Sequence, residues 1–305
     1  MHQESHSAQP RHLAMVMGAA LLWGTVGVTT QALYHSSTTN PISIGFFRLA
    51  LAVPVLLIVN GVVLGRAGWR IARRDLGIMT LIGLLLALYQ ACYFASIARI
   101  GVTVATLVTL CLAPVLVAIF VTTFTAERLT SKLILALTAA IAGIVCVVLG
   151  RHGNASGTND ALGILFAIGS ATGYASITLA GRAIASRYHA IQITTVGFAA
   201  GAVALLGIAL VTGFATTYDA HSWLLLGYLG LVPTALAYGL FMTGMRSTPA
   251  TVATIATLLE PLTATLLAAI LFGEQLGVVG VLGAILLIGA LTLISWPTRT
   301  AVRTS

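Results

Sequence analysis

The sequence predicts an all-α membrane protein with ten transmembrane helices, arranged as two inverted five-helix repeats around a central cavity. The first observation is composition, because the 305 residues are 58% hydrophobic and 7% charged, with a mean hydropathy of +1.03. A soluble chain of this length needs many more charged residues at its surface, so the lipid bilayer is the predicted surrounding of this one. The second observation is that the apolar residues form ten long runs. The third is that the later runs repeat the spacing of the earlier ones.

The ten apolar runs are close to the length that a membrane-crossing helix requires, which is about 20 residues. Most of the connections between them are short, so we expect consecutive spans to pack side by side as antiparallel hairpins. The predicted spans are residues 13–33, 41–63, 76–98, 102–121, 131–149, 161–181, 191–212, 223–244, 250–272 and 276–294.

The repeat consists of identical residues that lie 147 positions apart, such as Arg99 and Arg246. This spacing aligns the third to fifth spans with the eighth to tenth without a gap. Each half has five spans, an odd number, so the two halves must cross the membrane in opposite directions. Inverted repeats of this kind place a substrate site near the midplane between the halves and permit alternating access. The other pairs are Gly83 with Gly230, Phe94 with Phe241, Pro114 with Pro261, and Glu127 with Glu274.

Polar segments divide the chain into five parts. The first apolar run is too long for the apolar region of a signal peptide and has no convincing cleavage site, so we interpret it as the first span. The parts are an N-terminal tail at 1–12, a first repeat at 13–150, a polar linker at 151–160, a second repeat at 161–296 and a C-terminal tail at 297–305.

The distribution of Lys and Arg predicts the orientation, because loops rich in these residues stay in the cytoplasm. With the N-terminus inside, twelve of the 15 Lys and Arg residues fall in inner segments. Only Arg99 and Arg151 fall in outer segments, and Arg48 lies within a span. We therefore expect both termini to be cytoplasmic. The basic residues are scattered between apolar runs, so the net charge of +8 is not interpreted as a nucleic-acid surface.

Glu260 is the most informative single residue, because it lies in the middle of the apolar run 250–272 and directly precedes Pro261. An acid at the bilayer centre is energetically costly and is usually functional, and a proline leaves a nearby carbonyl without its helical partner. Two interpretations remain open. Either Glu260 carries a proton or binds a substrate ammonium, with burial favouring its neutral form, or it satisfies the backbone that Pro261 opens.

Arg48 is the basic counterpart, and the repeat does not require it, since it aligns near Ala199. It lies seven residues into its span, about 10 Å from the end at a rise of 1.5 Å per residue. It could grip a substrate carboxylate, or its long side chain could reach the outer surface by snorkelling.

Aromatic and hydroxyl side chains follow helical spacing in several spans, where each presents a polar stripe to a neighbour or to water. The alternative for each is an interhelical hydrogen bond, worth about 0.6 kcal/mol, or simple packing. We predict that these residues contribute to substrate binding, with the aromatic members forming a box for an apolar side chain. They are Trp23, Thr25, Tyr89, Gln90, Tyr93, Tyr174, Thr178 and Tyr238.

Pairs shared by both halves are predicted to be architecture. Pro114 and Pro261 are expected to kink the fourth and ninth spans symmetrically and to thin the wall of the cavity. Glu127 and Glu274 lie at span ends, where we expect each to cap the following helix or to pair with Arg128 or a lipid headgroup.

Four stretches of the sequence resemble the EamA-type transporters of the drug/metabolite transporter superfamily. They are LLWG at 21–24, the arginine in FFRLALA at 46–52, LAPVLVAIF…AE at 112–127 and LEPLTATLLAAILFGE at 259–274. The resemblance covers nearly all of the chain as two tandem modules. It implies a ten-helix fold with inverted five-helix repeats around a central cavity, and export of small metabolites. Within the family the chain is similar to exporters of aromatic and other amino acids.

Together these features predict a secondary transporter that exports amino acids or related small metabolites across a bacterial inner membrane. Protons are a second predicted partner if Glu260 couples their movement to transport, whereas downhill efflux needs none. A carrier of anionic metabolites such as sugar phosphates is an alternative, but it needs several basic groups in the cavity, and Arg48 is the one basic residue that lies well inside a predicted span.

A membrane enzyme is the remaining alternative, and the sequence disfavours it. All seven histidines lie outside the apolar runs, so no span contains the Ser and His of a nucleophile–base pair. The three cysteines form no CxxC pair, which argues against a metal site. There is no Walker A loop for ATP. We therefore expect no cofactor and no metal.

Overall fold

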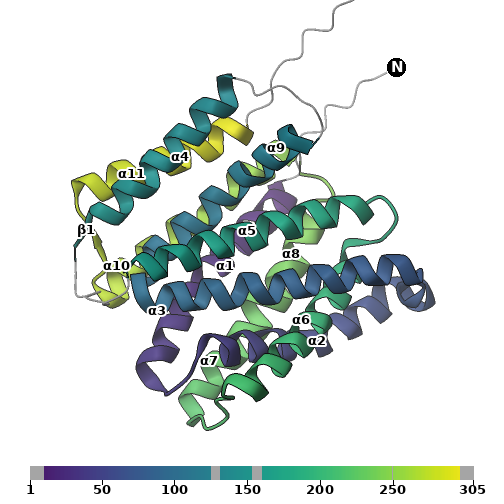
Figure 1. Cartoon of the computed structure of the whole chain (residues 1–305). Coiled ribbons are helices and arrows are strands. Elements are labelled where there is room, and N and C mark those ends of the chain that lie inside the picture. Colours follow the sequence, from purple (N-terminus) through teal and green to yellow (C-terminus); the bar gives the residue numbers. More distant parts are fainter. Residues whose placement is uncertain (1–9, 125–130, 153–159, 249, 296–305) are drawn as a thin grey trace, which may run out of the picture.

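The computed structural model describes residues 10–124, 131–152, 160–248 and 250–295, and these residues are almost entirely helical, which confirms the all-α prediction (Figure 1). Most of both predicted tails, most of the predicted linker, and Glu127 with Arg128 lie outside the described residues. The first half of the chain contains α1 (Pro10–Ser36), α2 (Pro41–Leu64), the 3₁₀ helix η1 (Gly65–Trp69), α3 (Arg73–Phe124) and α4 (Ser131–Leu149).

Helix α3 contains the third and fourth predicted spans, joined by a sharp turn at Gly101. Gly101 has φ of 79°, a conformation that favours glycine. The hydroxyl groups of Tyr93 and Thr106, on either side of this turn, are 2.7 Å apart. In a straight helix 13 residues would separate them by about 20 Å, so the chain doubles back and the two parts pack as an antiparallel hairpin.

The second half begins after the short strand β1 (Arg151–His152), and two of its spans are interrupted helices. Helices α7 and α8 are joined by a π turn, so together they form one continuous stretch, whereas α9 and α10 are separated at Leu258. The elements are α5 (Asp160–Ile184), α6 (Ala190–Thr212), α7 (Ala220–Gly230), the π turn η2 (Leu231–Leu236), α8 (Ala237–Gly244), α9 (Ala250–Thr257), α10 (Leu259–Phe272), β2 (Gln275–Leu276) and α11 (Val278–Ser295).

Six helical stretches of the described residues are long and apolar enough to cross a membrane: 10–36, 41–69, 73–121, 161–184, 190–212 and 220–244. Three shorter apolar helices cover 134–147, 259–272 and 278–290. The stretch 73–121 contains two predicted spans because of the turn at Gly101. The exact number of ten spans stays a prediction.

Equivalent helices of the two halves run in opposite directions where they meet. Helices α4 and α11, the last of each half, lie side by side (Figure 1). Gly150 approaches Gly280 at one end of the pair, and Gly143 approaches Leu287 further along, so the two helices are antiparallel. Helices α2 and α6 are antiparallel in the same way, since Gly45 contacts Leu205 and the Thr195 hydroxyl contacts the Leu56 carbonyl.

The glycine pair of the repeat occupies equivalent packing positions. A Cβ atom at Gly83 of α3 would lie 2.4 Å from the carbonyl oxygen of Gly197 in α6. A Cβ atom at Gly230 of α7 would lie 2.6 Å from the Cβ of Leu51 in α2. Each glycine therefore permits a close approach to a helix of the other half. The two glycines 147 positions apart therefore make equivalent contacts, each with a helix of the opposite half.

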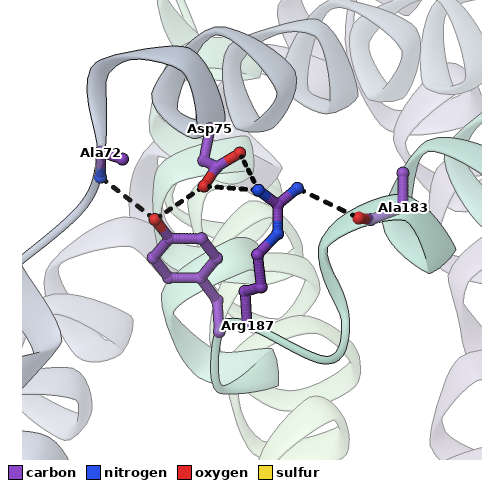
Figure 2. A network of polar contacts seen from close by, with 5 residues as sticks. Ala72, Asp75, Ala183 and Arg187 are labelled. Carbon is purple, nitrogen blue, oxygen red and sulfur yellow. Dashed lines mark hydrogen bonds and ion pairs between the residues drawn. The ribbon is translucent and has the colours of Figure 1, made fainter.

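Polar contacts join the two halves at one end of the bundle. Figure 2 shows the Arg187 guanidinium between Asp75, on the first turn of α3, and the Ala183 carbonyl at the end of α5. Arg187 Nη1 lies 3.0 Å from Asp75 Oδ1, and the hydroxyl of Tyr188 donates to Asp75 Oδ2 at 2.9 Å. The Tyr188 hydroxyl also accepts a hydrogen bond from the backbone N–H of Ala72 at 3.1 Å.

Candidate functional site

A small cavity of about 40 Å³ lies between the two halves of the molecule. Seven of the ten predicted binding residues line it, and they come from α1, α2, α3, α5, α8 and α10. They are Trp23, Arg48, Tyr89, Gln90, Tyr174, Tyr238 and Glu260. The other lining residues were not predicted from the sequence, and they are Leu49, Leu86, Leu110, Phe198 and Thr234. Most of these carry no polar group, so nothing in their immediate sequence distinguishes them from ordinary packing residues.

Arg48 points into the protein and not toward the outer surface, so snorkelling is the wrong interpretation of this residue. Only 7% of its surface is exposed. Its Nε donates a hydrogen bond to the hydroxyl of Thr234 at 2.9 Å, and its Nη1 contacts Gln90 Oε1 at 3.4 Å. The guanidinium carbon also lies 6.0 Å from the ring centroid of Phe94. The cation is thus held by neutral groups, and no carboxylate among the described residues pairs with it.

Glu260 lines the same cavity and supplies a group whose charge is opposite to that of Arg48. It is in the first turn of α10, immediately after the interruption at Leu258. Its carboxyl group receives no hydrogen bond from the described residues and is not within ion-pair distance of Arg48. The alternative in which Glu260 satisfies the backbone opened by Pro261 therefore has no hydrogen bond among the described residues to support it. The cavity presents one acid and one base that are not paired with each other.

Aromatic rings form two connected groups around these charges. Trp23 packs against Tyr238 with ring centroids 5.2 Å apart, and Tyr238 packs against Phe198 at 5.2 Å. Tyr89 packs against Tyr174 at 5.5 Å. The indole N–H of Trp23 is buried and has no hydrogen-bond partner among the described residues. The walls therefore combine large apolar surface with one donor that lacks an acceptor.

The family model of the EamA-like transporter family matches residues 11–149 and 161–296 of this chain. The chain belongs to the EamA-like transporter family. The two matches show a multi-pass membrane transporter in which the same module occurs twice.

This transporter is also similar to other transporters in sequence and to a solved structure in fold. It is 30% identical over 299 residues to an uncharacterized transporter, YwfM, of Bacillus subtilis, covering 93% of this chain and 94% of that protein. It is 26% identical over 295 residues to an uncharacterized inner membrane transporter, YicL, of Salmonella typhimurium, covering 94% and 96%. A crystal structure with 20% sequence identity superimposes with a TM-score of 0.64 over 92% of this chain and 95% of that one. At this identity the superposition shows the shared fold alone.

Three of the ten residues that were predicted to bind substrate do not line the cavity. The hydroxyl of Thr25 donates to the Leu22 carbonyl and lies 2.9 Å from the Tyr228 hydroxyl. Thr178 donates to the Tyr174 carbonyl within its own helix. The Tyr93 hydroxyl is hydrogen-bonded to the Thr106 hydroxyl across the α3 hairpin. The ring of Tyr93 stacks on the ring of Tyr89, with 6.1 Å between the two ring centroids. For these three the structure favours the hydrogen-bonding alternative.

Glu274 is a cap, but the helix that it caps is not the one expected. Its two carboxylate oxygens accept hydrogen bonds from the backbone N–H groups of Val102 at 2.7 Å and Thr103 at 2.9 Å. These groups begin the second part of α3, in the other half of the transporter, whereas the sequence analysis expected the helix that follows Glu274. A Cβ atom at Gly101 would lie 2.6 Å from Glu274 Oε1, so the glycine makes room for the cap.

The two prolines of the repeat have different surroundings in this structure. The second part of α3 continues as a helix through Pro114, whereas the chain around Pro261 is interrupted at Leu258. Symmetric kinking therefore stays a prediction. The asymmetry coincides with Glu260, which aligns with Ala113 in the first half.

Proposed function

We propose that this transporter exports small zwitterionic metabolites of the amino-acid type from the cytoplasm by alternating access through the cavity between its halves. The observation that supports this proposal most directly is the presence of Arg48 and Glu260 on one cavity without a mutual ion pair. A zwitterion carries one carboxylate for Arg48 and one ammonium for Glu260. Charge-assisted hydrogen bonds of this type are among the strong ones, and they fix the orientation of a ligand.

The aromatic walls favour an apolar or aromatic side chain on the substrate. Trp23, Tyr89, Tyr174, Phe198 and Tyr238 all line the cavity. Aromatic side chains bury large areas and prefer edge-to-face or offset contacts with other rings. The proposed substrates are therefore amino acids with apolar side chains, in keeping with the sequence resemblance to exporters of aromatic and other amino acids.

The size of the cavity supports a moving wall. A site for one water needs about 10–15 Å³ on this measure, so 40 Å³ accommodates a few water molecules and not a whole amino acid. The walls must therefore separate before substrate enters. Antiparallel pairs of equivalent helices, such as α2 with α6, provide two bundles that can rock against each other around the cavity.

The alternative substrates fit the cavity less well. A doubly charged anion such as a sugar phosphate requires several basic groups, and Arg48 is the only one among the described lining residues. A membrane enzyme requires a nucleophile with a base, and the described lining residues include no Ser, Cys or His.

The test is a competition assay with the purified full-length transporter in proteoliposomes. The assay follows counterflow of radiolabelled L-phenylalanine and competes it with L-phenylalanine, L-phenylalaninamide or N-acetyl-L-phenylalanine. The zwitterion should compete at least ten-fold better than either analogue, because each analogue removes one of the two charges. Equal competition by all three compounds, or no counterflow with any apolar amino acid while glucose 6-phosphate is carried, would refute the proposal.

A further inference from the structure

We propose that Thr234 is the positioning residue that sets the direction of the Arg48 guanidinium and so gives the cavity its preference for carboxylates. The carboxylate preference rests on the proposed function, whereas the hydrogen-bond chain that carries the argument stands by itself. Thr234 is completely buried, and its hydroxyl is the nearer of the two side chains that hold Arg48.

The hydrogen-bond chain starts at the carbonyl of Leu229, for which Pro233 cannot supply the usual α-helical donor. In an α-helix the N–H of residue 233 would bond to the carbonyl of Leu229, but Pro233 has no N–H to donate. The hydroxyl of Thr234 donates to this carbonyl instead, at 2.6 Å. The backbone widens locally into the π turn η2, and such single-turn insertions are frequent at functional sites.

Donation to Leu229 leaves the Thr234 hydroxyl only as an acceptor. A hydroxyl has one proton and two lone pairs, so once the proton is used, its oxygen must face a donor. That donor is Arg48 Nε at 2.9 Å. Fixing Nε fixes the plane of the rigid guanidinium, and the second contact, Gln90 at 3.4 Å, is longer and weaker. The Nη groups thereby keep a defined direction relative to the cavity that Arg48 lines.

A close helix contact brings Thr234 to Arg48. A Cβ at Gly230, one turn before Thr234, would lie 3.2 Å from the carbonyl oxygen of Arg48 and 2.6 Å from the Cβ of Leu51. The absent side chain therefore lets α7 approach α2 at the level of the arginine. Gly83 makes the equivalent approach in the other half, but Pro233 and Thr234 align with Leu86 and Ala87 there. Both halves thus share the close approach of the helices, but only the second half has a threonine hydroxyl at this position.

The experiment compares Thr234→Val, Thr234→Ser and Thr195→Val with wild type. Valine keeps the shape and removes the hydroxyl, and serine restores the hydroxyl. Thr195 is a matched control because it is also buried and does not line the cavity; its hydroxyl donates to the Ile191 carbonyl of its own helix at 2.6 Å and makes only a long contact of 3.5 Å with the Leu56 carbonyl of α2. The first measurement is the exchange rate of the Arg48 Nε proton by NMR of the ¹⁵N-arginine-labelled protein in micelles, with the signal assigned by its loss in Arg48→Lys. The second is KM and maximal rate for L-phenylalanine and L-phenylalaninamide in proteoliposomes.

In Thr234→Val the Nε proton should exchange at least ten-fold faster, and KM for L-phenylalanine should rise about ten-fold while its maximal rate stays within two-fold. KM for the amide should change little, Thr234→Ser should resemble wild type, and Thr195→Val should alter neither readout. Unchanged Nε exchange in Thr234→Val overturns the positioning role, and equal rises in KM for acid and amide overturn the carboxylate preference. If wild type carries neither compound, the proposed function and its carboxylate preference fail, and the NMR result still decides the positioning role.

Discussion

Glu260 and Glu274 are two acids of one helical segment, and the structure gives them opposite surroundings. Glu274, just beyond the end of α10, receives two backbone N–H groups from the other half of the transporter. Glu260, at its start, lines the cavity and receives no hydrogen bond from the described residues. The repeat already separates them, since Glu274 has a counterpart in Glu127 and Glu260 aligns with Ala113.

In this molecule the acid that has a counterpart in the other half, Glu274, forms hydrogen bonds with the backbone, and the acid that has no counterpart, Glu260, does not. The acid that both halves share completes the backbone of a helix end, where two donors would otherwise be orphaned. The acid that one half adds has no hydrogen-bond or ion-pair partner among the described residues, and an uncompensated charge that is partly withdrawn from water is expensive. Retaining such a group is physically reasonable when a ligand or a proton supplies the missing partner.

The largest expected effect follows from Glu260→Gln, which removes the charge and keeps the shape. L-phenylalanine transport should fall about 10–100-fold, equivalent to the roughly 1.5–3 kcal/mol of a charge-assisted hydrogen bond, and thermal stability should be unchanged or higher. Proteoliposome flux with and without a pH gradient, beside a melting curve in detergent, measures both. Wild-type flux that ignores the gradient would contradict proton coupling, and full flux in the variant would contradict a role in binding.

Glu274→Gln should produce the reverse pattern. The amide keeps one acceptor but loses the charge that receives the N–H groups of Val102 and Thr103, so the variant should lose about 1–2 kcal/mol of unfolding free energy. The ratio of KM values for L-phenylalanine and its amide should remain that of wild type. A change in this ratio without a change in melting temperature would contradict the separation of the two acids.

Asp75 is a third acid, with a partner that is half exposed. Its side chain is 5% exposed and that of Arg187 is 49% exposed, so solvent screens the pair and reduces its value. A double-mutant cycle of Asp75→Asn and Arg187→Gln should give a coupling of about 1 kcal/mol, decreasing at high salt. A coupling of several kcal/mol would indicate a fully desolvated pair and contradict this ranking.

The smallest effect is expected at Asp219, which precedes α7 and is fully exposed. Interactions with Ser222, first with its side-chain hydroxyl and then with its backbone N–H at 2.9 Å, lower the pKa of Asp219 below its ordinary value. Because the pKa is lower in the folded state, the contribution to stability is present above about pH 4 and is lost as the pH falls below it. Melting temperatures from pH 3 to 6 should show a slightly shallower acid loss in Asp219→Asn, and identical curves would contradict the cap.

Much of the architecture was predictable because it depends on short-range patterns. The ten apolar runs predicted the helical segments, and the spacing between Gly83 and Gly230 predicted positions that pack equivalently. The candidate cavity was largely predictable as well, since polar residues within apolar runs are rare and conspicuous. Arg48, Gln90 and Glu260 were identified in this way.

Contacts between halves account for what the sequence analysis missed. Arg48 donates a hydrogen bond to Thr234, 186 positions away, and a threonine after a proline in an apolar run is not distinctive. Glu274 is likewise far from the α3 backbone that it caps, since Val102 lies 172 positions before it. The spacing of Thr178 on α5 allows either a cavity position or a bond to its own helix, and in the structure its hydroxyl donates to the Tyr174 carbonyl of that helix.

The sequence by itself determined that the chain lies in a membrane, that it is built from two related halves and which residues interrupt its apolar runs. These properties follow from hydropathy and from the spacing of residues along one dimension. Only the tertiary structure decided that Arg48 turns inward and that Glu274 caps a helix of the opposite half. Each of these depends on a partner brought close by helix packing, and the free energy of a polar group is set by the neighbours that it finds there and not by its position in the chain.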